Sequence, residues 1–306
     1  MNASLSVHPS DHRATPEQIL QRLDWKVIRR LDGLLQGDYR TLFYGDGLDF
    51  ADLREYEPQD DIRHIDWNVT ARMNSLHVRQ YVEDREIIAW FLVDLSPSMN
   101  FGPLERPKER VLIDLVATLA RLLTRSGNRV GAILYNNRLE RTIPARGGRI
   151  QVLRLIREMQ RETEAPPKST TDLNVLFNAG LNTFKRRSLV FVISDFLSEP
   201  GWQKPLSLLN RHHELVGIRL WDARETELPN AGMIVVQDAE TGEQLHIDTS
   251  NPEFRRRFYT AAHRREEELK NILNRAGVDL YSVSTEEDLV AGIVRMAAQR
   301  KKRRSL

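Results

Sequence analysis

Two apolar runs that each end in an aspartate constrain the fold of this chain most strongly. The first, "EIIAWFLVD", ends at Asp94, and the second, "SLVFVISD", ends at Asp195. Both are almost continuously apolar, which is typical of strands that are covered on both faces. Segments with helical spacing of apolar residues separate these runs from the other predicted strands. We therefore expect an α/β fold with an open, mostly parallel, Rossmann-like sheet and helices on both faces.

The pattern of predicted elements divides the chain into seven segments. They are a disordered N-terminus (1–14), an N-terminal helix (15–40), a β-rich segment (41–84), an α/β core (85–228), a β-hairpin (229–250), a helix–strand–helix segment that completes the core (251–298) and a basic tail (299–306). The N-terminal helix has a capping-box signature, with Thr15 as N-cap and Gln18 three residues later. We expect the hairpin and the β-rich segment to pack together as a small accessory module.

Composition narrows the class of protein. The chain has 306 residues, no cysteine and a net charge of +2, so disulfides and thiolate metal sites are excluded. The charge is too small to indicate nucleic-acid binding by itself. No apolar stretch approaches 18 residues and the N-terminus has no apolar signal region, so we expect a cytoplasmic protein with no membrane span.

Oxygen-bearing side chains gather where the predicted strands end. Asp94, Ser96 and Ser98 follow the first core strand, Thr171 lies before a predicted helix, and Asp195 follows a later strand. Ligand sites in open α/β sheets lie just outside the carboxyl ends of the strands. Two carboxylates and three hydroxyls suit a hard divalent cation, Mg²⁺ in particular. The alternative is that the two serines only cap the following turn.

The expected charge of this site indicates what would complete it. If the hydroxyls bind the cation directly and the aspartates act partly through water, the protein does not neutralise the cation fully. Such a site attracts a carboxylate from a partner. A hydrolase would instead surround its metal with several direct carboxylates and a positioned base.

Three short motifs carry a resemblance to a known site. "DLSPSM", "TTDL" and "VISDF", in this order, resemble the metal-ion-dependent adhesion site (MIDAS) of von Willebrand factor type A domains. The resemblance implies that Asp94, Ser96, Ser98, Thr171 and Asp195 hold Mg²⁺ or Mn²⁺. It also implies that an acidic side chain of a partner completes the coordination.

A second resemblance covers roughly residues 40–285. The stretch from Gly45 to Glu86 is similar to the signature of the bacterial family called domain of unknown function 58, which joins it to a von Willebrand A-like domain. The matching positions are Arg54, Tyr56, Pro58, Asp60, Asp61, Arg63, Ile65, Asp66 and Trp67. Gln59, Ser169 and Thr170 stand where the family usually has glycine. The resemblance implies a MoxR-type AAA+ ATPase as partner.

The acidic stretch "DDIRHIDW" admits two interpretations. Asp60, Asp61, His64 and Asp66 could form a second metal or nuclease-like site. We favour a structural role, in which the first two aspartates pair with Arg54 and Arg63 and fix an irregular β region around Trp67, because charges in such regions are usually paired. The same surface could serve for docking.

The sequence predicts a non-enzymatic, metal-dependent protein–protein interaction module. No nucleophile elbow and no phosphate-binding P-loop motif is present. We expect an adaptor or co-chaperone that engages a MoxR-type AAA+ ATPase, or its client, through the metal. One alternative is a Mg²⁺-dependent phosphoester hydrolase that uses Asp94 and Asp195. A weaker one is nucleic-acid binding through the basic tail.

Overall fold

The fold is taken from a computed structural model of the chain. The structure describes residues 14–35, 53–58, 60–62, 65–73, 75–79, 86–103, 106–161, 170–238 and 242–304. The segment expected to be disordered, 1–14, lies outside these ranges except for its last residue.

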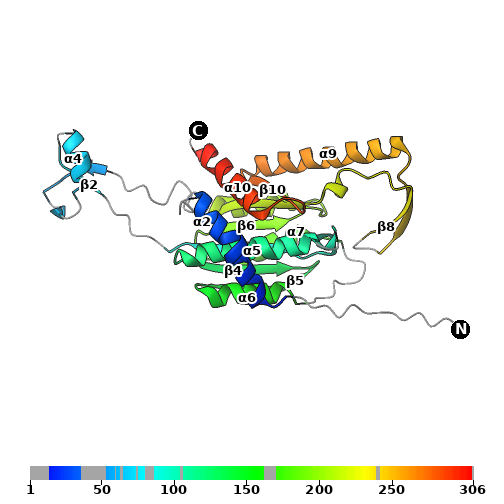
Figure 1. Cartoon of the computed structure of the whole chain (residues 1–306), viewed down its shortest axis with the longest axis horizontal. Helices are drawn as coiled ribbons and strands as arrows, with labels where there is room; N and C mark the ends of the chain where they lie inside the picture. Colours follow the sequence, from blue (N-terminus) through cyan, green and yellow to red (C-terminus); the bar gives the residue numbers. More distant parts are fainter. Residues whose placement is uncertain are drawn as a thin grey trace.

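A six-stranded sheet forms the centre of the molecule (Figure 1). Its order is β10-β7-β6-β3-β4-β5, and only β5 runs antiparallel to its neighbour. The strands are β3 (Ile88–Asp94), β4 (Arg129–Tyr135), β5 (Leu139–Arg146), β6 (Leu189–Ser194), β7 (Glu214–Trp221) and β10 (Asp279–Ser284). The mostly parallel α/β sheet expected from the sequence is therefore confirmed. Because the chain winds outward in both directions from β3 and β6, the topological switch point lies between these two strands.

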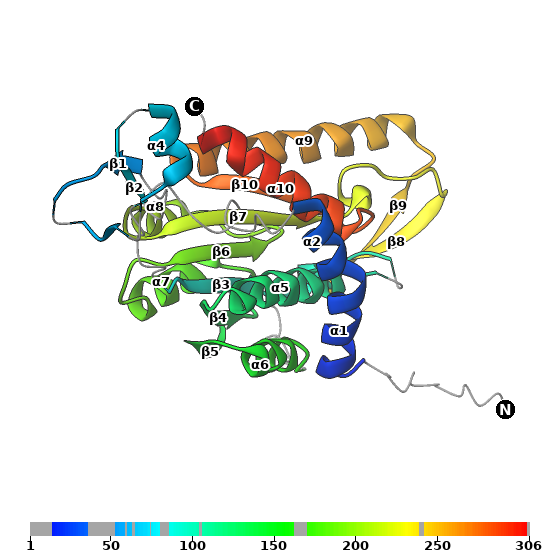
Figure 2. The same cartoon turned by 60° about the vertical axis from the view of Figure 1, so that its left-hand side comes forward.

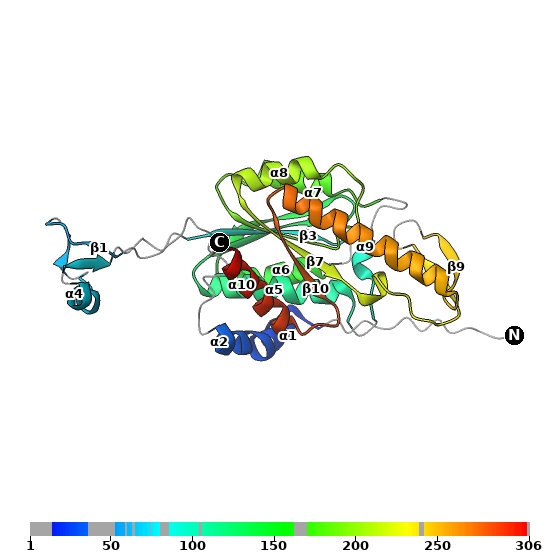
Figure 3. The ribbon, with the colours of Figure 1, turned by 90° about the horizontal axis from the view of Figure 1, so that it is seen from above.

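Helices cover both faces of the sheet (Figure 3). One face carries α1 (Pro16–Leu23), α2 (Arg29–Leu35), α5 (Lys108–Arg125), α6 (Arg149–Met159) and α10 (Leu289–Arg304). The other carries α7 (Leu173–Thr183), α8 (Gln203–His212) and α9 (Pro252–Arg275). Right-handed crossovers between parallel strands place helices on both faces in this way.

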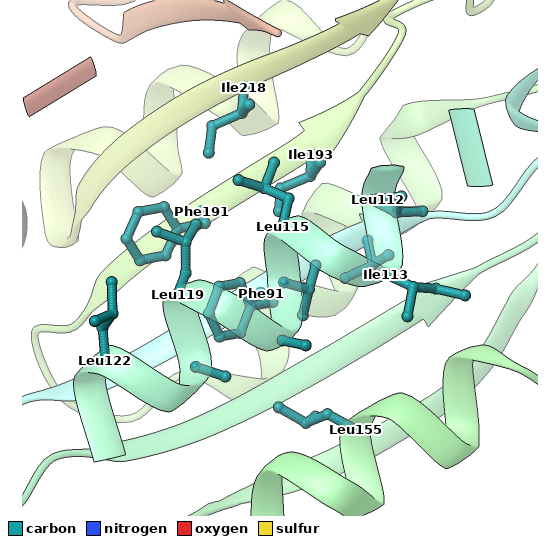
Figure 4. Packing of buried hydrophobic residues seen from close by; sticks show 14 of the residues in the cluster. Phe91, Leu112, Ile113, Leu115, Leu119, Leu122, Leu155, Phe191, Ile193 and Ile218 are labelled. Atoms are coloured by element: carbon teal, nitrogen blue, oxygen red, sulfur yellow. The ribbon is translucent and has the colours of Figure 1, made fainter. Parts of the chain in front are cut away.

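Part of the larger buried cluster lies where α5 crosses the central strands (Figure 4). The rings of Phe91 and Phe191, from neighbouring strands, stack with centroids 5.2 Å apart. Leu115 and Leu119 of α5 belong to the same fully buried cluster. Burying one such side chain stabilises the fold by roughly 1.5–3 kcal/mol, so this layer holds the carboxyl ends of β3 and β6 in fixed positions.

The N-terminal helix begins as predicted but is not one regular helix. The backbone N–H of Thr15 donates to the Gln18 side chain at 2.8 Å, and the Thr15 hydroxyl accepts from the Gln18 N–H at 3.3 Å. A π-helical segment, η1 (Asp24–Ile28), separates α1 from α2. The three pieces pack beside α5 and α10 (Figure 2). Residues 36–40 of the expected helix lie outside the described residues.

The β-rich segment contains a helix that the sequence did not predict. Between the short strands β1 (Leu53–Glu55) and β2 (His77–Arg79), residues Trp67–Met73 form α4. The Asp66 carboxylate accepts from the Val69 N–H at 3.3 Å, which makes Asp66 an N-cap. The expectation of an irregular β region around Trp67 was wrong, because a high density of charged and turn-forming residues hid the capping residue.

The expected hairpin is present as β8 (Met233–Gln237) and β9 (Gln244–Asp248), paired antiparallel. It lies at the opposite end of the molecule from β1, α4 and β2 (Figure 1). The joint accessory module that the sequence suggested is therefore not confirmed.

The basic C-terminal residues are part of a helix. α10 runs to Arg304, so the expected separate tail at 299–306 is, over most of its length, the last turns of this helix. Among the described residues, no helix is long and apolar enough to cross a membrane.

Candidate functional site

The candidate site lies at the switch point, where two adjacent parallel strands end. Asp94 is the last residue of β3, and Asp195 directly follows β6. The register pairs Val93 with Ile193, so the two carboxylates leave the sheet side by side. Their exposed fractions are 0% for Asp94 and 2% for Asp195. Two buried carboxylates this close require compensating partners.

Backbone and hydroxyl donors hold Asp94. Its Oδ1 accepts from the Ser96 N–H at 2.9 Å, and its Oδ2 accepts from the Ser194 hydroxyl at 2.6 Å. The Ser96 and Ser98 hydroxyl oxygens lie 3.1 Å apart. Both serines are placed by a sharp turn from β3 into the 3₁₀ helix η3 (Pro97–Asn100). The first motif therefore forms one connected cluster of oxygen atoms.

Burial disfavours the ionised form of the Asp94 carboxyl. It raises the pKa of Asp94 from 3.8 to about 6, and the neighbouring charge of Asp195 raises this pKa further against the opposing hydrogen bonds from Ser194 and Ser96. A raised carboxyl pKa shows that its surroundings neutralise the ionised form incompletely. A cation placed beside Asp94 would favour that ionised form.

A buried lysine supplies part of the missing positive charge. Lys108 is the first residue of α5 and has an exposed fraction of 0%. Its ammonium donates to Asp195 Oδ2 at 2.7 Å and to Glu225 Oε1. Glu225 closes the short helix η4 (Ala223–Glu225) that follows β7.

The lysine and its glutamate partner respond differently to burial. Burial acts against the ammonium of Lys108, but Asp195 and Glu225 outweigh it, so the pKa of Lys108 is raised. Burial also raises the pKa of Glu225, and the attraction of Lys108 only partly opposes this. The ammonium therefore stays charged between two carboxylates that it cannot fully neutralise.

Thr171 comes to the same edge of the sheet on the loop before α7. It is 1% exposed, and its hydroxyl donates to the side-chain oxygen of Asn137 at 2.9 Å. Its carbonyl accepts from the Glu199 N–H at 2.8 Å and from the Ser198 hydroxyl at 3.1 Å. The loop is thereby tied to the turn after β4 and to the chain that follows Asp195.

The donor set of this cluster fits a divalent cation. Asp94, Asp195 and Glu225 carry three negative charges when ionised, and Lys108 carries one positive charge, which leaves two negative charges unbalanced. The serine hydroxyls and carboxylates offer only oxygen, which Mg²⁺ and Mn²⁺ accept. In the part of the chain that the structure describes, no three His, Cys, Asp or Glu side chains form a metal-binding group. A cation here would therefore depend on hydroxyls and water as well as on carboxylates.

The acidic stretch before the core stands apart from this cluster. The Asp60 carboxylate accepts from the Glu57 N–H at 2.9 Å, Asp66 is buried as the cap of α4, and Trp67 is 64% exposed. Tyr56 is half-buried and Asp61 is exposed. Arg63 and the side chain of Arg54 lie outside the described residues, so their expected pairing with the first two aspartates stays a prediction. His64, named for the alternative metal or nuclease-like site, also lies outside them.

The structure adds four residues that sequence reasoning missed: Lys108, Glu225, Ser194 and Asn137. The lysine left a signal in the sequence. It shares the helical stripe of Val111, Leu112 and Leu115, all of them buried, and a lysine on such a stripe needs a buried partner. The other residues left no comparable signal.

Fold and site together define an open, doubly wound α/β protein with a buried cluster of carboxylates and hydroxyls at its switch point. Over residues 52–268 the chain matches the family model described as "Protein of unknown function DUF58", and it belongs to this family. The family resemblance drawn from the motifs is thus confirmed.

Mycobacterial relatives match over most of the chain. An uncharacterized protein of Mycobacterium tuberculosis strain H37Rv is 36% identical over 285 residues, which cover 92% of this chain and 89% of the relative. An uncharacterized protein of Mycobacterium avium is 32% identical over 160 residues, which cover 52% of this chain and 94% of that protein.

Solved structures show more distant similarity. The conserved hypothetical protein BatB from Bacteroides thetaiotaomicron has a TM-score of 0.45 at 14% identity, covering 72% of this chain and 98% of that one. An aerotolerance-related membrane protein from Bacteroides fragilis has a TM-score of 0.48 at 12% identity, covering 71% and 98%.

Proposed function

We propose that this protein is a non-enzymatic, metal-dependent protein–protein interaction module with a von Willebrand A-like site at the switch point. The observation that carries the proposal is the cluster of Asp94, Ser96, Ser98 and Asp195, in which both carboxylates are buried and every proposed ligand atom is an oxygen. A divalent cation is the simplest partner for such a cluster.

The contacts of the cluster suggest which side chains would bind the cation directly and which would act through water. The hydroxyls of Ser96, Ser98 and Thr171 would bind Mg²⁺ or Mn²⁺ directly. Both oxygens of Asp94 already accept hydrogen bonds, which suits a carboxylate that acts through water. When bound, the cation would supply an open coordination position for an acidic side chain of a partner.

The partner we propose is a MoxR-type AAA+ ATPase or its client, with this protein as adaptor or co-chaperone. The proposal rests on the family resemblance and on the chemistry of the site. A cation that its own protein neutralises incompletely favours a carboxylate ligand from outside. A hydrolase would need a base that is free to take a proton, whereas the carboxylate of Glu225 is held by Lys108.

The test compares partner capture by the full chain in Mg²⁺ and in EDTA. Ser98→Ala removes one proposed ligand, and Ser207→Ala is the matched control because its half-buried hydroxyl only donates to the Gln203 carbonyl on α8. We expect an AAA+ ATPase or a client protein to be retained by the wild type and the control in Mg²⁺. EDTA and Ser98→Ala should each abolish retention.

Circular dichroism of each variant shows that the fold is intact. An identical set of captured proteins in all four samples would refute the metal-dependent function. Capture that survives EDTA but is lost in Ser98→Ala would also refute it, because the metal would then have no part in docking.

A further inference from the structure

Lys108 is a completely buried charged group in the described core. Its side chain is among the largest that are completely buried, and it lies on the apolar stripe of α5 beside Val111 and Leu112. An ammonium group in such surroundings is strongly disfavoured unless its partners compensate for the lost water. Its retention in the core therefore calls for a specific role.

The contacts of Lys108 lie inside the candidate metal site. Its Nζ donates to Asp195 Oδ2 at 2.7 Å, and the other oxygen of Asp195 accepts from the Leu197 N–H at 3.0 Å. Both oxygens of this carboxylate are thus already engaged. A divalent cation that drew on Asp195 would meet the ammonium at the same atom and would be repelled by it.

Glu225 offers the ammonium a second acceptor. It comes from a different strand end than Asp195 and is not among the proposed ligands, yet it shares the same lysine. The Lys108 ammonium can therefore keep its hydrogen bond to Glu225 when the Asp195 carboxylate turns toward a cation. The negative charge of Glu225 also attracts the cation from outside its ligand sphere.

We infer that Lys108 is an internal counter-cation that sets the metal affinity of the site: it neutralises Asp195 in the metal-free protein and competes with Mg²⁺ or Mn²⁺ for that carboxylate. The inference rests on the proposed function, because it concerns the same site. It assigns opposite effects to two residues that touch each other. Lys108 weakens metal binding, and Glu225 strengthens it.

The experiment measures Mn²⁺ binding to the full chain from the electron paramagnetic resonance signal of free Mn²⁺. Lys108→Met keeps the aliphatic length and removes the charge, and Glu225→Gln removes the opposing charge. Lys204→Met, at an exposed lysine of α8, is the matched control. One unit charge close to a buried divalent cation changes its affinity by about tenfold or more.

We expect the Mn²⁺ dissociation constant to fall about tenfold in Lys108→Met and to rise about tenfold in Glu225→Gln, with Lys204→Met unchanged. The melting temperature of Lys108→Met should also rise more on addition of Mn²⁺ than that of the wild type. If Lys108→Met does not fold, the rise in Glu225→Gln decides the question.

Two different failures are distinguishable. Binding that is unaffected by either substitution, or weakened by Lys108→Met in a folded protein, would overturn the counter-cation role and leave the metal site intact. No binding of Mn²⁺ to the wild type or any variant would overturn the proposed metal site and this inference with it.

Discussion

Asp94→Asn should change how stability depends on pH, because the folded protein raises the pKa of this carboxyl to about 6 from its ordinary value of 3.8. The folded state therefore binds a proton more tightly than the unfolded state. Stability from the protonated carboxyl is fully present below about pH 4 and is lost as pH rises through about 6. Each pKa unit corresponds to about 1.36 kcal/mol, so ionised Asp94 costs the metal-free protein ~3 kcal/mol at pH 7.5.

The substitution removes the charge and preserves most of the contacts. The side-chain oxygen of asparagine can still accept from the Ser96 N–H, and its amide can donate to the hydroxyl oxygen of Ser194. Relative to the wild type, Asp94→Asn should thus gain ~3 kcal/mol of unfolding free energy between pH 4 and pH 7.5. The comparison between the two proteins cancels the titration of those carboxylates that do not interact with Asp94.

The assay is urea unfolding at half-unit steps of pH, in EDTA, followed by tryptophan fluorescence and circular dichroism. The difference in unfolding free energy between variant and wild type should rise with pH and level off above about 7. A difference that stays constant across this range would refute the argument that burial and Asp195 leave Asp94 incompletely neutralised. A difference that falls with pH would show that the site already neutralises Asp94 fully.

Three further substitutions test the packing and hydrogen bonding of the central sheet. Gly131→Ala would place a Cβ 2.7 Å from the Trp90 ring, so we expect a loss of ~2 kcal/mol in urea unfolding. In Gly217→Ala the nearest atom would be 3.4 Å from the added Cβ, so the loss of unfolding free energy should be well below that of Gly131→Ala. Equal losses in the two variants would contradict the steric argument. Thr285→Val removes a 2.5 Å hydrogen bond to the buried Asp222 carboxylate and should cost ~2 kcal/mol, also by urea unfolding. An unchanged midpoint would mean that water replaces this donor.

The sheet could be predicted because its signal is local and redundant. The run that ends at Asp94 is buried at nearly every position, as expected for a central parallel strand. The hairpin at β8 and β9 followed from alternation about a glycine-containing turn in the same way. Each of these elements is specified by its own residues, so the local sequence pattern was enough to locate it.

Two local elements were not predicted, because their sequence patterns were weak or ambiguous. The π-helical segment Asp24–Ile28 keeps the apolar residues of a continuous helix, so its periodicity resembles that of an α-helix. α4 is only seven residues long, and its cap Asp66 stands among several other acidic residues. Neither segment is long enough for its residue pattern to distinguish one type of secondary structure from another.

For the site, strand patterning was enough to indicate which oxygen-bearing residues follow the strands. It also indicated that Asp94 and Asp195 would meet at one edge of a parallel sheet. How the charge of these two carboxylates is balanced became visible only in the packing of the folded chain. Lys108, Asp195 and Glu225 are far apart in sequence and come from α5 and from the ends of two different strands. Motif spacing records where a residue lies along one strand or helix, whereas the balance of buried charge depends on which elements pack together.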